Sequence, residues 1–129
     1  MEHGIRVSTV NLSSSDPQGL SRFYAALLGL EVETDEPEWV VIGGRGSIPL
    51  AFELDQHYQP PVWPSEPGRP PTQSHLEVRV DDLEGALAHA LACGARLAEF
   101  QPQDDVRVCL DPAGHPFCLY VDEAEEQAE

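Results

Sequence analysis

The 129-residue sequence has few basic residues, no long apolar run and no Cys-x-x-Cys pair. Seven lysine and arginine residues stand against 23 acidic ones, which gives a formal net charge of −16. Such a balance repels phosphate backbones and anionic membranes, so we expect no nucleic acid and no membrane as a partner. No run of about 18 apolar residues and no signal-peptide pattern is present, so we expect a cytoplasmic protein.

The three cysteines, Cys93, Cys109 and Cys118, are an odd number, which favours reduced thiols over a disulfide framework. A hydrophobic content of 41% is sufficient for one domain, or for two small units that share a core. Part of the acidic excess lies in the tail 122–129, which has little to bury and which we expect only to solubilise the chain end.

The segment 74–94 predicts a strand that runs directly into a helix. Apolar and polar residues alternate over 75–80, which is the period of a strand with one apolar face. Asp82 is suited to cap the helix that follows, and Gly94 is suited to end it. The apolar stripe of that helix consists of Leu83, Leu87 and Leu91 with the intervening alanines.

The first module, residues 1–54, has the same order of elements. Residues 5–12 alternate as a strand, and Asp16 with Pro17 predicts the start of a helix that ends before Gly29. Three further strands are expected at 31–34, 39–42 and 50–54, separated by turn-rich segments. The module is therefore predicted to be βαβββ.

Residues 55–73 are rich in proline and connect the halves without regular structure. Trp63 in this connector either packs down as an anchor or forms the wall of a pocket or a dimer seam, and both alternatives leave it partly buried.

The second module, residues 74–121, repeats the first at a spacing close to 65 residues, with further strands at 96–100, 106–110 and 116–121. A repeat of complete βαβββ units predicts an α+β fold of two modules whose curved sheets enclose a pocket.

Four segments together resemble the vicinal oxygen chelate superfamily, in particular its glyoxalase-like and bleomycin-resistance-like members. They are Asp16-Pro17 through Gly29, Pro60-Pro61-Val62-Trp63-Pro64, His75-Leu76-Glu77-Val78 through Leu83, and Asp111-Pro112-Ala113-Gly114-His115-Pro116-Phe117-Cys118. The resemblance implies the glyoxalase/bleomycin resistance/dioxygenase fold, a homodimer and a small-molecule site between curved sheets.

Strand alternation places one set of polar side chains opposite the helix-facing residues of the sheets. With Trp63 as a wall, the candidate pocket residues are Thr9, Asn11, Glu53, Trp63, His75, Glu77, Arg79, Cys118 and Tyr120.

The resemblance also implies positions for a metal. Metal-dependent relatives take four ligands from the first, fourth, fifth and eighth strands, and the matching residues here are Thr9, Glu53, His75 and Cys118. Glu53 and His75 are ligand types, whereas a threonine hydroxyl and a thiol suit a hard divalent ion poorly. We expect no cofactor; the alternative is zinc, iron or manganese held by Glu53 and His75, with Cys118 conceivable as a further zinc ligand.

Each candidate residue also has an ordinary structural interpretation. His75 at a strand entrance can simply hydrogen-bond a neighbouring carboxylate, and Cys118 can be a small core residue. Glu53, if buried, needs a partner such as His75 or Arg79. His115 lies in a turn and is expected to be exposed.

Three functions remain open. The first is a glyoxalase-like protein without a conventional metal centre that binds or transforms an organic metabolite or antibiotic. The second is a metal-dependent lyase, isomerase or dioxygenase. The third is a degenerate module that serves only in protein association.

Overall fold

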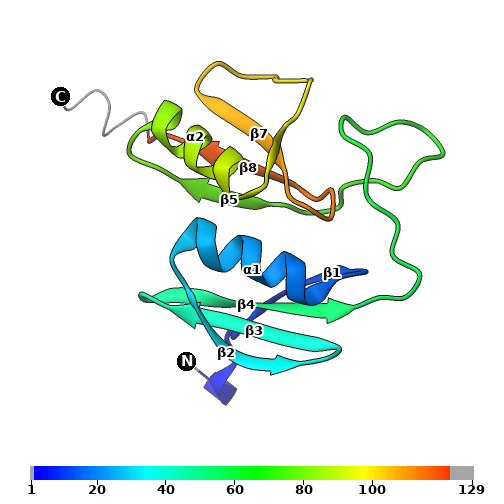
Figure 1. Ribbon diagram of the computed structural model, residues 1–129, viewed down its shortest axis with the longest axis vertical. Coiled ribbons are helices and arrows are strands. Elements are labelled where there is room, and N and C mark those ends of the chain that lie inside the picture. The colour runs from blue at the N-terminus through cyan, green and yellow to red at the C-terminus, as the bar shows by residue number, and fades with distance from the viewer. Residues whose placement is uncertain (1, 123–129) are drawn as a thin grey trace. The chain divides into compact units, whose positions relative to one another are not determined.

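The structure, a computed structural model, describes residues 2–122, and it divides the chain between Tyr58 and Gln59 into unit 1 and unit 2. Unit 1 contains η1 (Glu2–Gly4), β1 (Val10–Ser14), α1 (Pro17–Leu28), β2 (Glu31–Glu36), β3 (Trp39–Gly44) and β4 (Ser47–Leu54). Unit 2 contains β5 (Leu76–Arg79), α2 (Leu83–Cys93), β6 (Arg96–Leu97), β7 (Val106–Leu110) and β8 (Pro116–Tyr120) (Figure 1).

Within the described residues each unit forms one four-stranded mixed sheet, in the order β1-β4-β3-β2 and β5-β8-β7-β6. In both sheets the first and last strands of the unit pair in parallel, and the remaining neighbours are antiparallel. The predicted α+β fold of two βαβββ modules is confirmed. The expected acidic tail lies, apart from Asp122, outside the described residues.

Unit 1 has a dense apolar core between α1 and its sheet. Asp16 caps the helix by accepting a hydrogen bond from the Gly19 backbone N–H at 3.0 Å, and Gly29 ends it in the left-handed conformation with φ 70°. The Tyr24 ring stacks on Phe52 of β4 at a centroid distance of 5.9 Å, and both side chains are buried. Bulky side chains therefore hold this helix on the sheet.

Unit 2 has a thinner core. Ala90 is the α2 residue that is fully buried within the described chain, and Leu91 is 43% exposed, so the predicted leucine stripe is only partly covered. Asp82 occupies the N-cap position of α2 as expected, but within the described residues its side chain accepts no capping hydrogen bond. The small side chains of the alanine-rich helix contribute little apolar area per turn.

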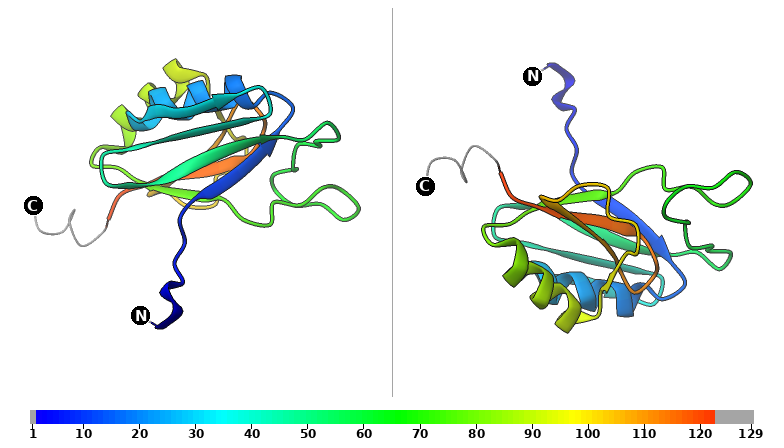
Figure 2. Two further views of the ribbon diagram at one scale, coloured as in Figure 1. Left: turned by 90° about the horizontal axis from the view of Figure 1, so that it is seen from below. Right: turned by 90° about the horizontal axis from the view of Figure 1, so that it is seen from above.

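The first strand starts later than predicted. Residues 5–9 are extended but unpaired in the described chain, and they run away from the sheet (Figure 2). Ile5 and Val7 are 72% and 73% exposed. Local alternation predicts a strand at 5–12, but pairing with β4 decides its extent and gives Val10–Ser14.

The strand predicted at 96–100 is shortened to Arg96–Leu97 because the side chain of Gln101 replaces strand pairing. Its amide nitrogen donates to the carbonyls of Ala98 and Val108 at 2.7 and 2.8 Å. Its amide oxygen accepts from the Val108 N–H at 2.9 Å. One glutamine side chain thus satisfies backbone groups that further strand residues would otherwise pair.

In unit 2, residues 59–75 form a loop that extends beyond the ends of the strands (Figure 2). Trp63 in this loop is half-buried, as both alternatives predict. Neither helix of the described units is long and apolar enough to span a membrane.

Candidate functional site

The sheet of unit 2 has a face directed away from its buried core, which we call the open face. Phe117 and Leu119 on β8 are 0% and 1% exposed on the core side. Because side chains alternate along a strand, Cys118 and Tyr120 lie on the other side, with their register partners Glu77 and Arg79 on β5. The open face therefore displays the polar residues of two parallel strands side by side.

Three chemically different groups meet on this face. His75 directly precedes β5, and its Nε2 lies 2.7 Å from Oε2 of Glu77, two residues further along the strand. Cys118 is the register partner of Glu77. The nitrogen, oxygen and sulfur atoms of His75, Glu77 and Cys118 all lie within 4.8 Å of one another. The predicted histidine–carboxylate contact is present, and Glu77 supplies the carboxylate.

The Cys118 side chain is a protonated thiol at neutral pH. Burial, followed by the charge of Glu77, a hydrogen bond to that carboxylate and the nearby Cys109, raises the pKa of Cys118 to about 12. Burial also raises the pKa of Cys109 to about 11. Since the thiolate is the nucleophilic form of cysteine, Cys118 is a poor nucleophile here.

Trp63 packs on a buried apolar cluster of unit 2 that includes Cys118. Its side chain packs against the cluster of Ala98, Val108 and Cys118, and Val106 and Leu110 pack against the same cluster. The indole N–H donates to the carbonyl oxygen of Phe100 at 3.2 Å, and the two rings lie 6.2 Å apart. Trp63 is therefore an anchored residue, and the cluster on which it packs contains Cys118, the register partner of Glu77.

The other predicted residues of unit 2 lie on the same face but further along the strands. Arg79 forms an ion pair with Asp81 at 3.3 Å. Tyr120, its register partner on β8, is half-buried. These two residues extend the polar row that begins at His75.

Unit 1 carries a simpler version of this face. The Asn11 amide donates to Oε2 of Glu53 at 3.1 Å, so Glu53 has a hydrogen-bond partner within unit 1. Glu53 is exposed, so its carboxylate does not need the ion pair that a buried acid would need. Glu53 belongs to unit 1 and His75 to unit 2, and their joint use as metal ligands stays a prediction.

The pairing register changes which residue of unit 1 corresponds to His75. Leu12 pairs with Phe52 as Leu76 pairs with Phe117, and the residues before them are Asn11 and His75. Thr9 is exposed and precedes β1. Counting back from the helix caps, which selects Thr9, misses a two-residue difference in strand register.

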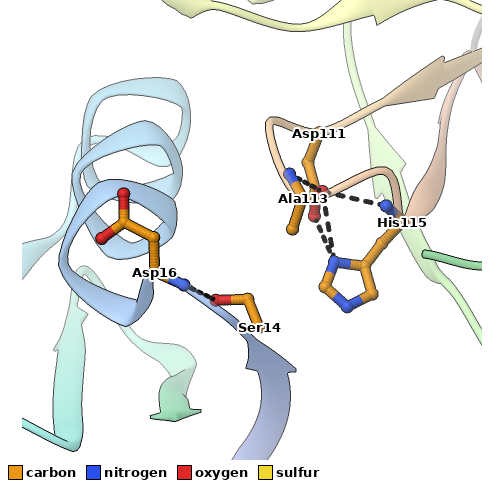
Figure 3. A network of polar contacts seen from close by, with 5 residues as sticks. All are labelled: Ser14, Asp16, Asp111, Ala113 and His115. Atoms are coloured by element: carbon orange, nitrogen blue, oxygen red, sulfur yellow. Dashed lines mark hydrogen bonds and ion pairs between the residues drawn. The ribbon is translucent and has the colours of Figure 1, made fainter. Parts of the chain in front are cut away.

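The turn between β7 and β8 contains a residue that the sequence did not reveal as important. Asp111 is fully buried, and its carboxylate accepts hydrogen bonds from the N–H groups of Ala113 and His115, each at 2.9 Å. It also lies 2.9 Å from Nδ1 of His115 (Figure 3). His115 is only 20% exposed, so its expected exposure is wrong.

Gly114 completes this turn with φ 92°, and a Cβ there would lie 3.0 Å from Pro60. Unit 1 has a different polar contact at the end of β1, where Ser14 Oγ accepts from the Asp16 N–H at 3.2 Å (Figure 3). The sequence Asp111-Pro112-Ala113-Gly114 predicts the turn of unit 2. It does not predict that the Asp111 carboxylate is buried, because burial depends on how the surrounding strands pack.

The ligand set implied by metal-dependent relatives does not fit a hard divalent ion. Magnesium and manganese prefer oxygen donors, whereas Cys118 offers a buried thiol. At the first-strand position, Thr9 and Asn11 offer only neutral groups, and the Asn11 amide already donates to Glu53. The donor chemistry therefore argues against a conventional oxygen-rich centre.

A family profile described as a glyoxalase-like domain matches residues 9–120, most of the chain. The chain belongs to the glyoxalase-like domain family. This family lies in the vicinal oxygen chelate superfamily, as the sequence resemblance implies. No curated protein matches the chain.

Solved structures of glyoxalase-like proteins share the fold. A glyoxalase/bleomycin resistance protein/dioxygenase family enzyme from Burkholderia phytofirmans PsJN is 20% identical, with 91% of this chain and 98% of that chain covered and a TM-score of 0.69. A glyoxalase-related enzyme from Fulvimarina pelagi is 19% identical, with 92% and 88% covered and a TM-score of 0.66. TnmS3, an antibiotic binding protein from Streptomyces sp. CB03234, is 20% identical, with 94% and 98% covered and a TM-score of 0.59.

Proposed function

We propose that this glyoxalase-like protein binds a small organic molecule, a metabolite or an antibiotic, on the open face of unit 2. The observation that carries the proposal is that Trp63 packs on the apolar cluster containing Cys118, and that the sulfur of Cys118 lies within 4.8 Å of the polar pair His75 and Glu77. An apolar surface with a few convergent polar groups is the usual composition of a small-ligand site. An aromatic or apolar part of the ligand would contact Trp63, and a polar part would contact the pair.

Charge favours a ligand with cationic character. The chain carries a formal net charge of −16, and Glu77 provides a carboxylate on the open face that is 54% exposed. An acidic protein attracts a cation over several ångströms and increases its rate of encounter. The antibiotic-binding description of TnmS3 is consistent with such a role for a protein of this fold.

Binding is a better interpretation than nucleophilic catalysis by Cys118. A thiol with a pKa of about 12 is almost entirely protonated at neutral pH. The conventional metal-dependent lyase, isomerase or dioxygenase is less well supported, because the Thr9, Glu53, His75 and Cys118 set does not suit a hard ion.

Fluorescence of the two tryptophans tests the proposal. In a Trp39→Phe variant the emission comes from Trp63, and a panel of cationic aromatic compounds and antibiotics is titrated against it. We expect at least one compound to change Trp63 emission saturably and to raise the unfolding temperature, as a ligand of the native state must. Glu77→Gln should weaken that binding by roughly tenfold, since it removes one charge-assisted contact.

The matched control is Glu99→Gln, which removes an exposed carboxylate of unit 2 that is not a candidate pocket residue and should leave binding at Trp63 unchanged. If no compound stabilises the protein or changes Trp63 emission, the binding proposal fails and a role in protein association alone is favoured.

A homodimer and a cytoplasmic location belong to the same proposal. Val32 and Ile48 of unit 1 are 51% and 52% exposed, which is apolar area that a second copy could cover. The three cysteines are free, as expected in a reducing compartment. Light scattering at micromolar concentration should give twice the monomer mass, and a monomer would contradict the dimer.

A further inference from the structure

The C-terminal end of α2 holds a histidine and a cysteine side by side on the surface of unit 2. His89 and Cys93 are four residues apart, and residues at this spacing face each other on a helix. Sγ of Cys93 lies 3.8 Å from Nε2 and 4.0 Å from Nδ1 of His89. His89 is exposed and Cys93 is half-buried, so solvent reaches both side chains. Both residues belong to the helix and not to the strands of the open face.

The backbone that carries this pair is anchored. The N–H of Gly94 donates to the carbonyl oxygens of Ala90 and Leu91, and the N–H of Ala95 donates to that of Ala90 at 3.0 Å. Ala90 and Ala95 are both buried in unit 2. Hydrogen bonds and packing therefore fix the spacing of the histidine and the cysteine before any ligand arrives, which lowers the entropic cost of binding one.

We infer that His89 and Cys93 bind a soft monovalent metal ion, copper(I), on α2. Thiolate sulfur selects copper(I), and imidazole also suits copper. Metal bonds of about 2.3 Å to sulfur and about 2.0 Å to nitrogen place two donors of one ion roughly 3.5–4.3 Å apart, over angles from tetrahedral to linear. The observed separations of 3.8 and 4.0 Å fall within this range. Copper(I) accepts fewer ligands than zinc, so a two-residue site suits copper(I) better.

Charge at the end of the helix favours a bound cation. α2 ends at Cys93, and the carbonyl groups at a helix C-terminus carry a partial negative charge that stabilises cations. The last turn of α2, all of which the structure describes, contains no basic residue that would compete for this position. A bare thiolate is favoured at a helix N-terminus instead. The pair is therefore better suited to hold a cation than to act as a nucleophile.

Binding replaces one covalent bond of the thiol. The S–H bond of Cys93 breaks, a copper–sulfur bond forms and the proton passes to the buffer. The two ring nitrogens of His89 are nearly equidistant from the sulfur, so a rotation of the exposed ring brings either of them to the ion. Copper stays in the +1 state, and no electron is transferred. The ion is the whole ligand, so this inference goes beyond the proposed binding function and does not depend on it.

The other two thiols must not contribute to the measurement. Cys109 and Cys118 are buried, and burial is the main cause that raises their pKa values to about 11 and about 12, so both stay protonated at neutral pH. Cys118 nevertheless lies near the ligand atoms of His75 and Glu77. The test therefore uses the full chain with Cys118→Ala, kept reduced and freed of metal, as the parent protein.

Competition with a chromophoric copper(I) chelator at neutral pH measures the affinity. We expect one copper(I) ion per chain. Cys93→Ala should weaken binding by at least about 100-fold and His89→Ala by at least about tenfold, since loss of even an outer-shell partner costs about 10–100-fold. Silver(I), which has the same charge and also prefers soft donors, should shift the ring resonances of His89 in NMR spectra of the parent protein.

A transposed histidine is the matched control for the spacing of the pair. The double variant His89→Ala, Ala92→His keeps the composition of the helix, but adjacent residues do not face each other on a helix, so its affinity should fall as far as that of His89→Ala. His57→Ala removes an exposed histidine of unit 1 and should leave the affinity unchanged.

The inference is overturned if the parent protein takes no copper(I) from the chelator. It is also overturned if His89→Ala or the transposed variant binds as tightly as the parent, because the thiol alone would then account for binding. Because the probe is a metal ion and the site lies on α2, a failure here leaves the organic-ligand titration on the open face unaffected, and the reverse also holds.

Discussion

Unit 1 and unit 2 have the same strand order but are held together differently. In unit 1, α1 buries Leu20, Phe23 and Tyr24, and Tyr24 stacks on Phe52. In unit 2, α2 is rich in alanine and buries Ala90, whereas the polar side chains of Gln101 and Asp111 hold the backbone of the strand ends. The comparison indicates that hydrogen bonds made by the buried Asp111 and the partly buried Gln101 compensate unit 2 for its smaller apolar core.

The largest expected effect comes from Asp111→Ala in unit 2. The variant leaves the N–H groups of Ala113 and His115 and the His115 ring without their buried carboxylate. We expect a loss of roughly 3–5 kcal/mol in the free energy of unfolding, as when a buried polar pair loses one partner. Urea unfolding followed through Trp63, in a Trp39→Phe background, measures the loss.

Glu99→Ala is the control for this measurement, because it removes an exposed carboxylate of the same unit and should cost less than about 0.5 kcal/mol. A cost below about 1 kcal/mol for Asp111→Ala would contradict the view that polar side chains stabilise unit 2.

The second-largest loss of stability is expected for Gln101→Ala in unit 2. This substitution removes the amide that bonds Ala98 and Val108, and it leaves their backbone groups to find water. We expect a loss of about 1–3 kcal/mol. Hydrogen exchange should accelerate at the Val108 amide, and the neighbouring Gln103→Ala serves as a control because its side chain is exposed. Unchanged exchange at Val108 would show that Gln101 does not protect this strand.

Local sequence patterns predicted the modules and their order because periodicity, helix starts and glycine ends are properties of neighbouring residues. They did not predict contacts that depend on strand register. The contact of His75 with Glu77, two residues away on the same strand face, is local and agrees with the expected neighbouring carboxylate, whereas the partner of Glu53 is Asn11 across a parallel pair. Alternation places each of these residues on a face, but only the paired strands show which residues touch.

The structural roles of Asp111 and Gln101 were not predicted, for a related reason. Asp111 reads as an ordinary Asp-Pro turn residue, and Gln101 reads as a loop residue. The importance of Asp111 comes from its burial and that of Gln101 from its hydrogen bonds to strand backbone, and both depend on how the surrounding strands pack.

A smaller difference in the free energy of unfolding is expected between variants at the N-termini of α1 and α2. Asp16→Ala removes the hydrogen bond from the Gly19 N–H, so we expect it to cost about 1 kcal/mol. Asp82→Ala removes a side chain that makes no capping bond within the described residues, so it should cost only a few tenths of a kcal/mol. Paired urea titrations compare the two variants. Equal costs would indicate that α2 is capped in solution as α1 is.

The smallest effect on stability at neutral pH is expected from Cys109 and Cys118 of unit 2, because burial raises the pKa of both thiols and keeps them protonated. In the folded protein the pKa values of Cys109 and Cys118 are about 11 and about 12, against an ordinary value of 9.0. Well below pH 9.0 both thiols are protonated in the folded and the unfolded chain, so they do not change stability with pH. As the pH rises through 9.0, the thiols of the unfolded chain lose their protons before those of the folded protein. The unfolded chain then binds fewer protons than the folded protein, so rising pH favours unfolding.

Unit 2 should accordingly lose stability at alkaline pH, and Cys118→Ala should reduce the slope of that loss. Urea midpoints measured through Trp63 on either side of pH 9.0 give the slope. Cys93→Ala, which removes a thiol from α2 rather than from the open face, is the matched comparison. An unchanged slope in Cys118→Ala would mean that this thiol is not held in its protonated form by burial and by Glu77.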